Sequence, residues 1–145
     1  MKKAIAMVLC LVLLVIGTGT AFVQAASIDE ANYVPIMPFW SFINSTTTTI
    51  GINNGRVVGE GVVIGISGVT TSVRVNLTIQ RRVAGSNAAW ATVASGQRTQ
   101  AGIVGALSID ATALSGFEFR TRAVYTAWSG SQSETHTSYS GIRRV

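Results

Sequence analysis

The sequence predicts an all-β domain, an antiparallel β-sandwich of about seven strands, preceded by a helical signal peptide. Three observations lead to this prediction. Apolar and polar residues alternate with a period of two between Val73 and Gln80, which is typical of a half-buried strand. Glycine, asparagine and serine interrupt the chain at short intervals, as turns between strands do. No sustained helical period appears after the N-terminal segment.

The N-terminus has the three parts of a secretory signal. Lys2 and Lys3 give the positive start, Ala4–Ile16 is apolar throughout, and Val23-Gln24-Ala25 supplies small residues for a cleavage site. We expect cleavage near Ala25, so that residues 1–25 are the signal peptide and the product is secreted. The apolar run is shorter than the roughly 20 residues that span a bilayer, which predicts no stable membrane span after cleavage. An uncleaved anchor is the alternative.

Processing changes the cysteine content and the charge of the chain. Cys10 is the single cysteine and lies in the apolar run, so the mature chain has no disulfide and depends on its apolar core. Loss of Lys2 and Lys3 leaves nine basic residues, all arginine, and six acidic residues, a net charge of +3 from nine minus six. This mild charge permits contact with anionic surfaces and does not point to nucleic acid.

The mature chain begins with an extended lead-in over residues 26–38, where Pro35 and Pro38 exclude a regular helix and disfavour a central strand. The sandwich domain is expected to occupy residues 39–145. Its first clear strand is the β-branched stretch Thr46–Ile52, which ends at the hairpin signal Asn53-Asn54-Gly55.

The remaining elements follow from composition and turn signals. Arg56–Ile66 reads as a valine- and glycine-rich strand, and its glycines predict bends or bulges. Turns are expected at Ala84–Ala88 and at Ser129–Gln132. Further strands are predicted at Val73–Gln80, from Trp90–Val93 onward, at Ile103–Ile109, at Phe117–Trp128 and at Glu134–Tyr139.

Two segments resemble fibronectin type III and other immunoglobulin-like sandwiches. Leu114–Val124 has a leucine, a glycine turn, an aromatic residue and then an alternating strand, and Val73–Val93 is similar to the third and fourth strands of such domains. The chain departs from the family at Phe119, because phenylalanine cannot donate the hydrogen bond of a tyrosine corner. The whole chain also resembles small uncharacterised exported proteins of Gram-positive bacteria.

The sequence has no catalytic, metal or cofactor motif. His136 is the single histidine, and its order relative to serine and acidic residues matches no known triad, so we expect a strand histidine that faces solvent or a neighbour. One histidine and six scattered acidic residues form no metal-ligand cluster. No phosphate-binding loop is present. The chain is therefore expected not to be an enzyme and to need no cofactor.

The strand pattern predicts a basic and aromatic surface. If the apolar residues of Val73–Gln80 and Phe117–Trp128 point inward, the alternate residues on both strands point outward, and these strands are neighbours in a fibronectin-like order. A short turn after Trp128 would place Arg122 beside Tyr139 for a cation–π contact. An ordinary solvated sheet face is the alternative. The residues of this possible binding face are Arg74, Arg120, Arg122, Trp128 and Tyr139.

The three tryptophans allow either sugar stacking or core packing. By pattern, Trp90 is expected inside the sandwich. Trp128 shares the outward parity of the arginines and is the best candidate for an exposed aromatic residue.

These observations together predict a secreted, non-enzymatic β-sandwich module that acts by binding, with an anionic extracellular polymer or another protein as partner. The oligomeric state is left open. One alternative is a self-assembling structural protein that adds edge to edge through Thr46–Thr49 and the glycine/valine-rich strand. Another is a polymer hydrolase, which would need two facing carboxylates such as Asp110 and Glu118.

Overall fold

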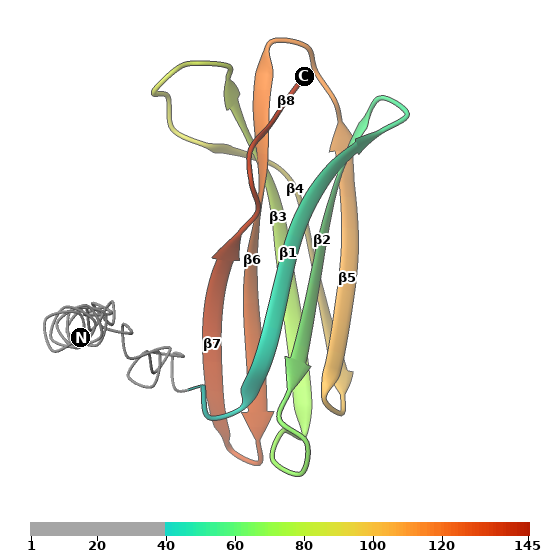
Figure 1. Cartoon of the computed structure of the whole chain (residues 1–145), viewed down its shortest axis with the longest axis vertical. Coiled ribbons are helices and arrows are strands. Elements are labelled where there is room, and N and C mark those ends of the chain that lie inside the picture. The colour runs from blue at the N-terminus through green and yellow to red at the C-terminus, as the bar shows by residue number, and fades with distance from the viewer. Residues whose placement is uncertain (1–39) are drawn as a thin grey trace, which may run out of the picture. The chain divides into compact units, whose positions relative to one another are not determined.

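The computed structural model describes residues 40–145, which form eight strands and no helix (Figure 1). The predicted signal peptide and the extended lead-in lie outside the described residues. No helix in the described part of the chain is long and apolar enough to cross a membrane. The strands are β1 (Ile43–Asn53), β2 (Arg56–Gly65), β3 (Ser72–Val83), β4 (Ala91–Ala101), β5 (Val104–Thr112), β6 (Phe117–Ser129), β7 (Gln132–Tyr139) and β8 (Arg143–Arg144).

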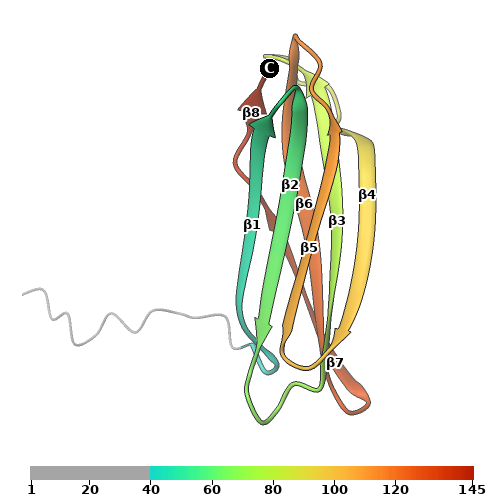
Figure 2. The same ribbon diagram turned by 90° about the vertical axis from the view of Figure 1, so that its right-hand side faces the viewer.

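The strands are arranged in two antiparallel sheets that face each other (Figure 2). One sheet has the order β1-β2-β5, and the other has the order β4-β3-β6-β7, with the short β8 also paired to β6. The predicted all-β architecture with two antiparallel sheets is confirmed. The predicted neighbours β3 and β6 are paired over their whole length, from Ser72 opposite Trp128 to Val83 opposite Phe117.

The first hairpin follows from its turn residues. Asn54 and Gly55 connect β1 to β2 and have φ values of 48° and 73°. Positive φ at both central residues defines the two-residue turn whose twist matches the twist of paired strands, and asparagine followed by glycine tolerates it best. Asn53 pairs with Arg56 directly beside the turn. The hairpin predicted from Asn53-Asn54-Gly55 is therefore present.

Alternate residues of β3 and β6 form the centre of the core. The inward-facing side chains of β3 are 0–1% exposed at Val73, Val75, Leu77 and Ile79. Strand β6 contributes the fully buried inward set Phe119, Thr121, Ala123, Tyr125 and Ala127. The two-residue period predicted for both strands is therefore confirmed, and it fixes which side chains face solvent.

Gly59 and Gly61 of β2 do not form the predicted bulges, whereas the register of β1 shifts beside Gly65, between Ile43 and Ser45. Pairing of β2 with β1 and β5 runs without a register shift past Gly59 and Gly61. Both glycines face inward, and a Cβ at Gly61 would lie 2.7 Å from Leu77 Cδ2 and 2.9 Å from the Tyr125 hydroxyl. Glycine is needed at Gly59 and Gly61 because the opposite sheet approaches these positions too closely for a Cβ atom.

Tyr125 links the two sheets. Its hydroxyl donates to the carbonyl oxygen of Thr47 at 2.6 Å and lies 2.8 Å from Thr48 Oγ1, both on β1 of the opposite sheet. Burial raises the pKa of this phenol above its usual value. Phe119 is fully buried and packs in the core with Ile50, Val57 and Ile79.

Candidate functional site

The outer surface of the five-stranded sheet, which contains β3 and β6, carries the predicted candidate residues. Arg120 and Arg122 alternate with buried residues on β6, and Arg74 has the same outward position on β3. Trp128 ends the outward row of β6, opposite Ser72. Tyr139 pairs with Arg122 across the β6–β7 ladder, as expected from the short turn. All five predicted residues therefore lie on one sheet face.

Four side chains on this face form an alternating stack of guanidinium groups and rings. The Arg82 guanidinium lies 4.5 Å from the Trp90 ring centroid, and Arg120 lies 4.4 Å from the same ring. Arg120 is also 4.7 Å from the Tyr139 ring. The Gln80 side chain accepts a hydrogen bond from Arg120 Nε at 2.9 Å and orients it. Such contacts are worth about 0.5–1 kcal/mol each at exposed sites.

This stack corrects two predictions. Trp90 does not pack inside the sandwich but lies between Arg82 and Arg120 on the outer face. It precedes β4, so strand parity could not assign its side. Tyr139 stacks with Arg120 and not with Arg122, although Arg122 is its directly paired residue. Long side chains on a sheet reach diagonal neighbours, which residue pairing alone does not reveal.

A second basic and aromatic pair lies at the other end of the same face. Arg74 is 4.9 Å from the Trp128 ring, and its Nε donates to Thr99 Oγ1 at 3.0 Å. Trp128 is eight residues beyond Arg120 on β6, which is about 26 Å along an extended strand. Arg122 lies between the two clusters. We call the whole set the basic-aromatic face: Arg74, Arg82, Trp90, Arg120, Arg122, Trp128 and Tyr139.

The positive charge of this face is largely uncompensated by acidic residues. Glu118 is the one carboxylate in its outward rows, and it lies at the end of the face, bonded to Arg82 Nε at 3.0 Å and to Arg144 Nη2 at 2.5 Å. Hydrogen bonds from Arg144, Arg82 and the Gly85 amide lower the pKa of Glu118 to about 2. Within residues 40–145, Arg74, Arg120 and Arg122 form no ion pair.

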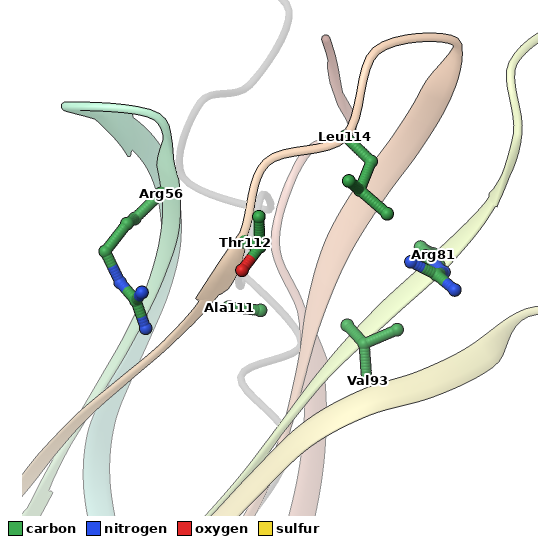
Figure 3. A pocket seen from close by; sticks show the side chains of 6 residues that line it. All are labelled: Arg56, Arg81, Val93, Ala111, Thr112 and Leu114. Carbon is green, nitrogen blue, oxygen red and sulfur yellow. The ribbon is translucent and has the colours of Figure 1, made fainter.

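The described part of the chain also has a shallow depression between the two sheets (Figure 3). Its volume is about 580 Å³, and it is open to solvent. The two arginines at its rim are already engaged, because Arg56 pairs with Asp110 and Arg81 lies 4.9 Å from the Phe117 ring. The lining residues are Arg56, Arg81, Val93, Ala111, Thr112 and Leu114. The basic-aromatic face is the stronger candidate, because three of its arginines (Arg74, Arg120 and Arg122) form no ion pair in the described residues, compared with one, Arg81, at the depression.

The other residues weighed from sequence have structural partners. His136 packs against the Trp40 ring with centroids 4.6 Å apart, and Glu134 accepts hydrogen bonds from the amides of Phe42 and Ile43. Asp110 and Glu118 each pair with arginine, which gives no support to a hydrolase. Residues 40–145 contain no group of three metal-ligating side chains.

No family model matches this chain. No curated protein is similar to it in sequence at a significant level. Solved structures that are similar to part of this chain include the following two. Catalytically inactive OgpA from Akkermansia muciniphila, in complex with an O-glycopeptide substrate, is 15% identical with a TM-score of 0.37, over 70% of this chain and 31% of that chain. The solution structure of R. palustris CsgH is 16% identical with a TM-score of 0.33, over 64% of this chain and 88% of that one.

Proposed function

We propose that this protein is a secreted, non-enzymatic β-sandwich module that binds an anionic extracellular polymer through the basic-aromatic face. The observation that carries the proposal is the alternating stack of Arg82, Trp90, Arg120 and Tyr139, continued along the sheet by the free arginine Arg122. The guanidinium groups can bind the negative charges of a polymer, and the rings can stack against its flat faces.

Preorganisation supports this function. Arg120 is held between two rings and by the Gln80 side chain, so less side-chain entropy is lost when it contacts a ligand. Except for Trp90, which precedes β4, the residues of the face lie on the paired strands β3, β6 and β7, which hold side chains more rigidly than loops would. Guanidinium groups also remain charged at every physiological pH.

Fold and export belong to the same proposal. The order β1-β2-β5 in one sheet and β4-β3-β6-β7 in the other supports a fibronectin type III-like or immunoglobulin-like arrangement, a common scaffold for extracellular modules. Release after cleavage near Ala25 would bring the domain, whose basic residues are all arginine, to the cell exterior. A Gram-positive bacterial source fits the lysine-started signal.

The proposal is tested by reversing charge on the face. Arg74→Glu combined with Arg122→Glu removes two guanidinium groups that have no ion pair in the described residues. We expect the dissociation constant for heparin, used as the anionic probe, to rise about tenfold or more. Calorimetry or a salt gradient on heparin resin measures this, with neutral dextran as the uncharged comparison.

A matched variant separates the face from net charge. Arg98→Glu with Arg143→Glu makes the same charge change, and these residues pair with the inward-facing Val75 and Phe119, away from the outer surface. This variant should bind heparin far better than the first. Equal weakening by both variants would mean that net charge alone attracts the polymer, and unchanged binding of the first variant would rule out the face.

A further inference from the structure

Strand β1 lies at one margin of the three-stranded sheet (Figure 2). Its register shifts between Ile43 and Ser45, but residues 46–53 lack the features that keep sheet edges from pairing. From Thr46 to Asn53 it has no charged residue and no proline, and it pairs with β2 without a register shift. Four threonines and two isoleucines give this stretch a high β-propensity. Natural proteins usually guard such an edge with charge, proline, a bulge or a covering segment.

The other three edges of the described sandwich are guarded. Strand β4 carries the exposed Arg98 and an irregularity in its pairing with β3. Strand β5 carries Asp110, and the Gln100 side chain accepts a hydrogen bond from the Ala106 amide at 3.0 Å. Strand β7 carries Glu134. The contrast singles out residues 46–53 of β1 as an edge segment without such a guard.

The hairpin turn fixes which backbone groups of β1 point to the open edge. The residues that flank a two-residue turn form a hydrogen-bonded pair, here Asn53 and Arg56, and hydrogen-bonded pairs recur at every second residue. The residues between them direct N–H and C=O away from β2. In the described chain, no backbone hydrogen bond joins these groups to another strand. The outward-directed residues are Thr46, Thr48, Ile50 and Ile52.

We propose that β1 pairs antiparallel with β1 of a second copy of this chain, with Thr49 opposite Thr49 on the two-fold axis. This register sets Thr46 opposite Ile52 and Thr48 opposite Ile50 of the second copy. All four outward-directed residues then form hydrogen-bonded pairs, which satisfies every free backbone group of the stretch. The result is one continuous six-stranded sheet.

The strand chemistry favours a second copy as the occupant. A two-fold pair places like residues near one another, so a charged strand would repel itself, whereas threonine opposite threonine is favourable. The pairing closes on itself, and the remaining edges β4, β5 and β7 are guarded. The assembly therefore stops at a dimer. The glycine/valine-rich β2 is a central strand, so it takes no part in edge-to-edge addition.

Cysteine cross-linking tests the register in the secreted protein, which has no cysteine of its own once the expected signal peptide with Cys10 is cleaved. In Thr49→Cys, the two thiols face each other across a non-hydrogen-bonded pair with Cα atoms about 4.5 Å apart, which a disulfide spans. Gly51→Cys is the control, because its two copies lie about 13 Å apart along the strands. We expect a disulfide-linked dimer for the first variant and none for the second on a non-reducing gel.

Hydrogen exchange and sedimentation complete the test. The amides of Thr46, Thr48, Ile50 and Ile52 should gain protection as protein concentration rises, in step with dimer formation. Protection at all concentrations in a monomer would overturn the proposal, because it would mean that the chain covers its own edge. Absence of protection at every concentration, or equal cross-linking of both cysteine variants, would also overturn it. Heparin binding by a monomer would remain possible, so this failure is distinct from failure of the proposed function.

Discussion

At the scale of single residues, Glu118 is the most constrained carboxylate in the described chain. It is 5% exposed and bonds to Arg82, Arg144 and the Gly85 amide, so it joins β3, β6, β8 and the turn after β3. A buried carboxylate with these partners is stable in its charged form, which is why its pKa falls to about 2. Removing the charge would leave the guanidinium groups of Arg82 and Arg144 without their counterion.

The stability of the protein should therefore fall in acid in a way that depends on Glu118. The folded pKa is about 2 and the ordinary value is 4.5, so the stabilisation is complete above pH 4.5 and is lost as the pH falls toward 2. We expect Glu118→Gln to lower the melting temperature at pH 7, and the difference from the parent to shrink between pH 4.5 and 2. Thermal melts by circular dichroism at several pH values measure it.

The control for that experiment is Glu60→Gln on the opposite sheet. Glu60 is exposed and forms no ion pair in the described residues. Its melting temperature should stay close to that of the parent at every pH. A constant difference between Glu118→Gln and the parent down to pH 2 would contradict the role given to this carboxylate.

Sequence could predict the outward residues on β3 and β6, because strand parity is a backbone property that the apolar pattern reveals. It could not predict that Arg120, rather than Arg122, stacks on Tyr139. This contact forms because a long side chain can reach a residue diagonally opposite on the neighbouring strand. Trp90 and Arg82 were missed as site residues because Trp90 precedes its strand. The adjacent pair Arg81-Arg82 was the one available signal.

At the scale of elements, the inward glycines of β2 set how closely the two sheets pack. Gly59 lies over Thr121, and a Cβ there would be 2.5 Å from Thr121 Oγ1. Gly61 lies over Leu77 and Tyr125 in the same way. Since any larger residue would push the sheets apart, the Tyr125 bond to β1 depends on these glycines as well.

A pair of glycine substitutions separates packing from backbone effects. Gly61→Ala introduces a Cβ 2.7 Å from Leu77 Cδ2 and should destabilise the fold by about 1–3 kcal/mol through overpacking. Gly51→Ala, on the outer side of β1 with no atom within 4 Å of the new Cβ, should be neutral or stabilise by about 0.4–1 kcal/mol. Urea denaturation measures both. Similar losses in the two variants would show that strand flexibility, and not sheet spacing, is what the glycines provide.

The strands themselves could be predicted because turn residues and the two-residue period are local signals. Asn54-Gly55 and the alternation of β3 are examples that the structure confirms. The full length of β4 could not be predicted from sequence. Ala91–Ala101 is mostly polar, and it forms a strand because it pairs with β3. Gly59 and Gly61 were interpreted as bulge residues because the sequence of one strand does not reveal how closely the opposite sheet approaches it.

At the scale of the whole described domain, the two outer surfaces differ in chemistry. The outer side of the β1-β2-β5 sheet has one arginine, Arg56 at its end, and this arginine pairs with Asp110. The basic-aromatic face lies on the opposite sheet. The proposed two-fold axis is perpendicular to the joined sheet, because Thr49 and its counterpart occupy the same face. Both copies therefore present the basic-aromatic face on the same side.

A dimer of this kind would bind a long polyanion with both faces at once. Thr49→Lys places two lysines opposite each other at the axis and should yield a monomer, and its apparent dissociation constant for long heparin should rise by about a hundredfold or more. The added positive charge would by itself strengthen binding, so a loss cannot come from charge. Affinity for a short oligosaccharide that reaches one face should stay unchanged. Calorimetry with both ligands measures the difference.

Ser108→Lys is the matched control, because Ser108 and Thr49 both pair with Glu60, from opposite sides of β2. It adds the same charge in the same row of the outer surface but lies on β5, away from the proposed axis. It should remain dimeric and bind long heparin as tightly as the parent. If Thr49→Lys is monomeric and yet keeps full affinity for long heparin, each face acts alone, and the two copies do not cooperate on one polymer.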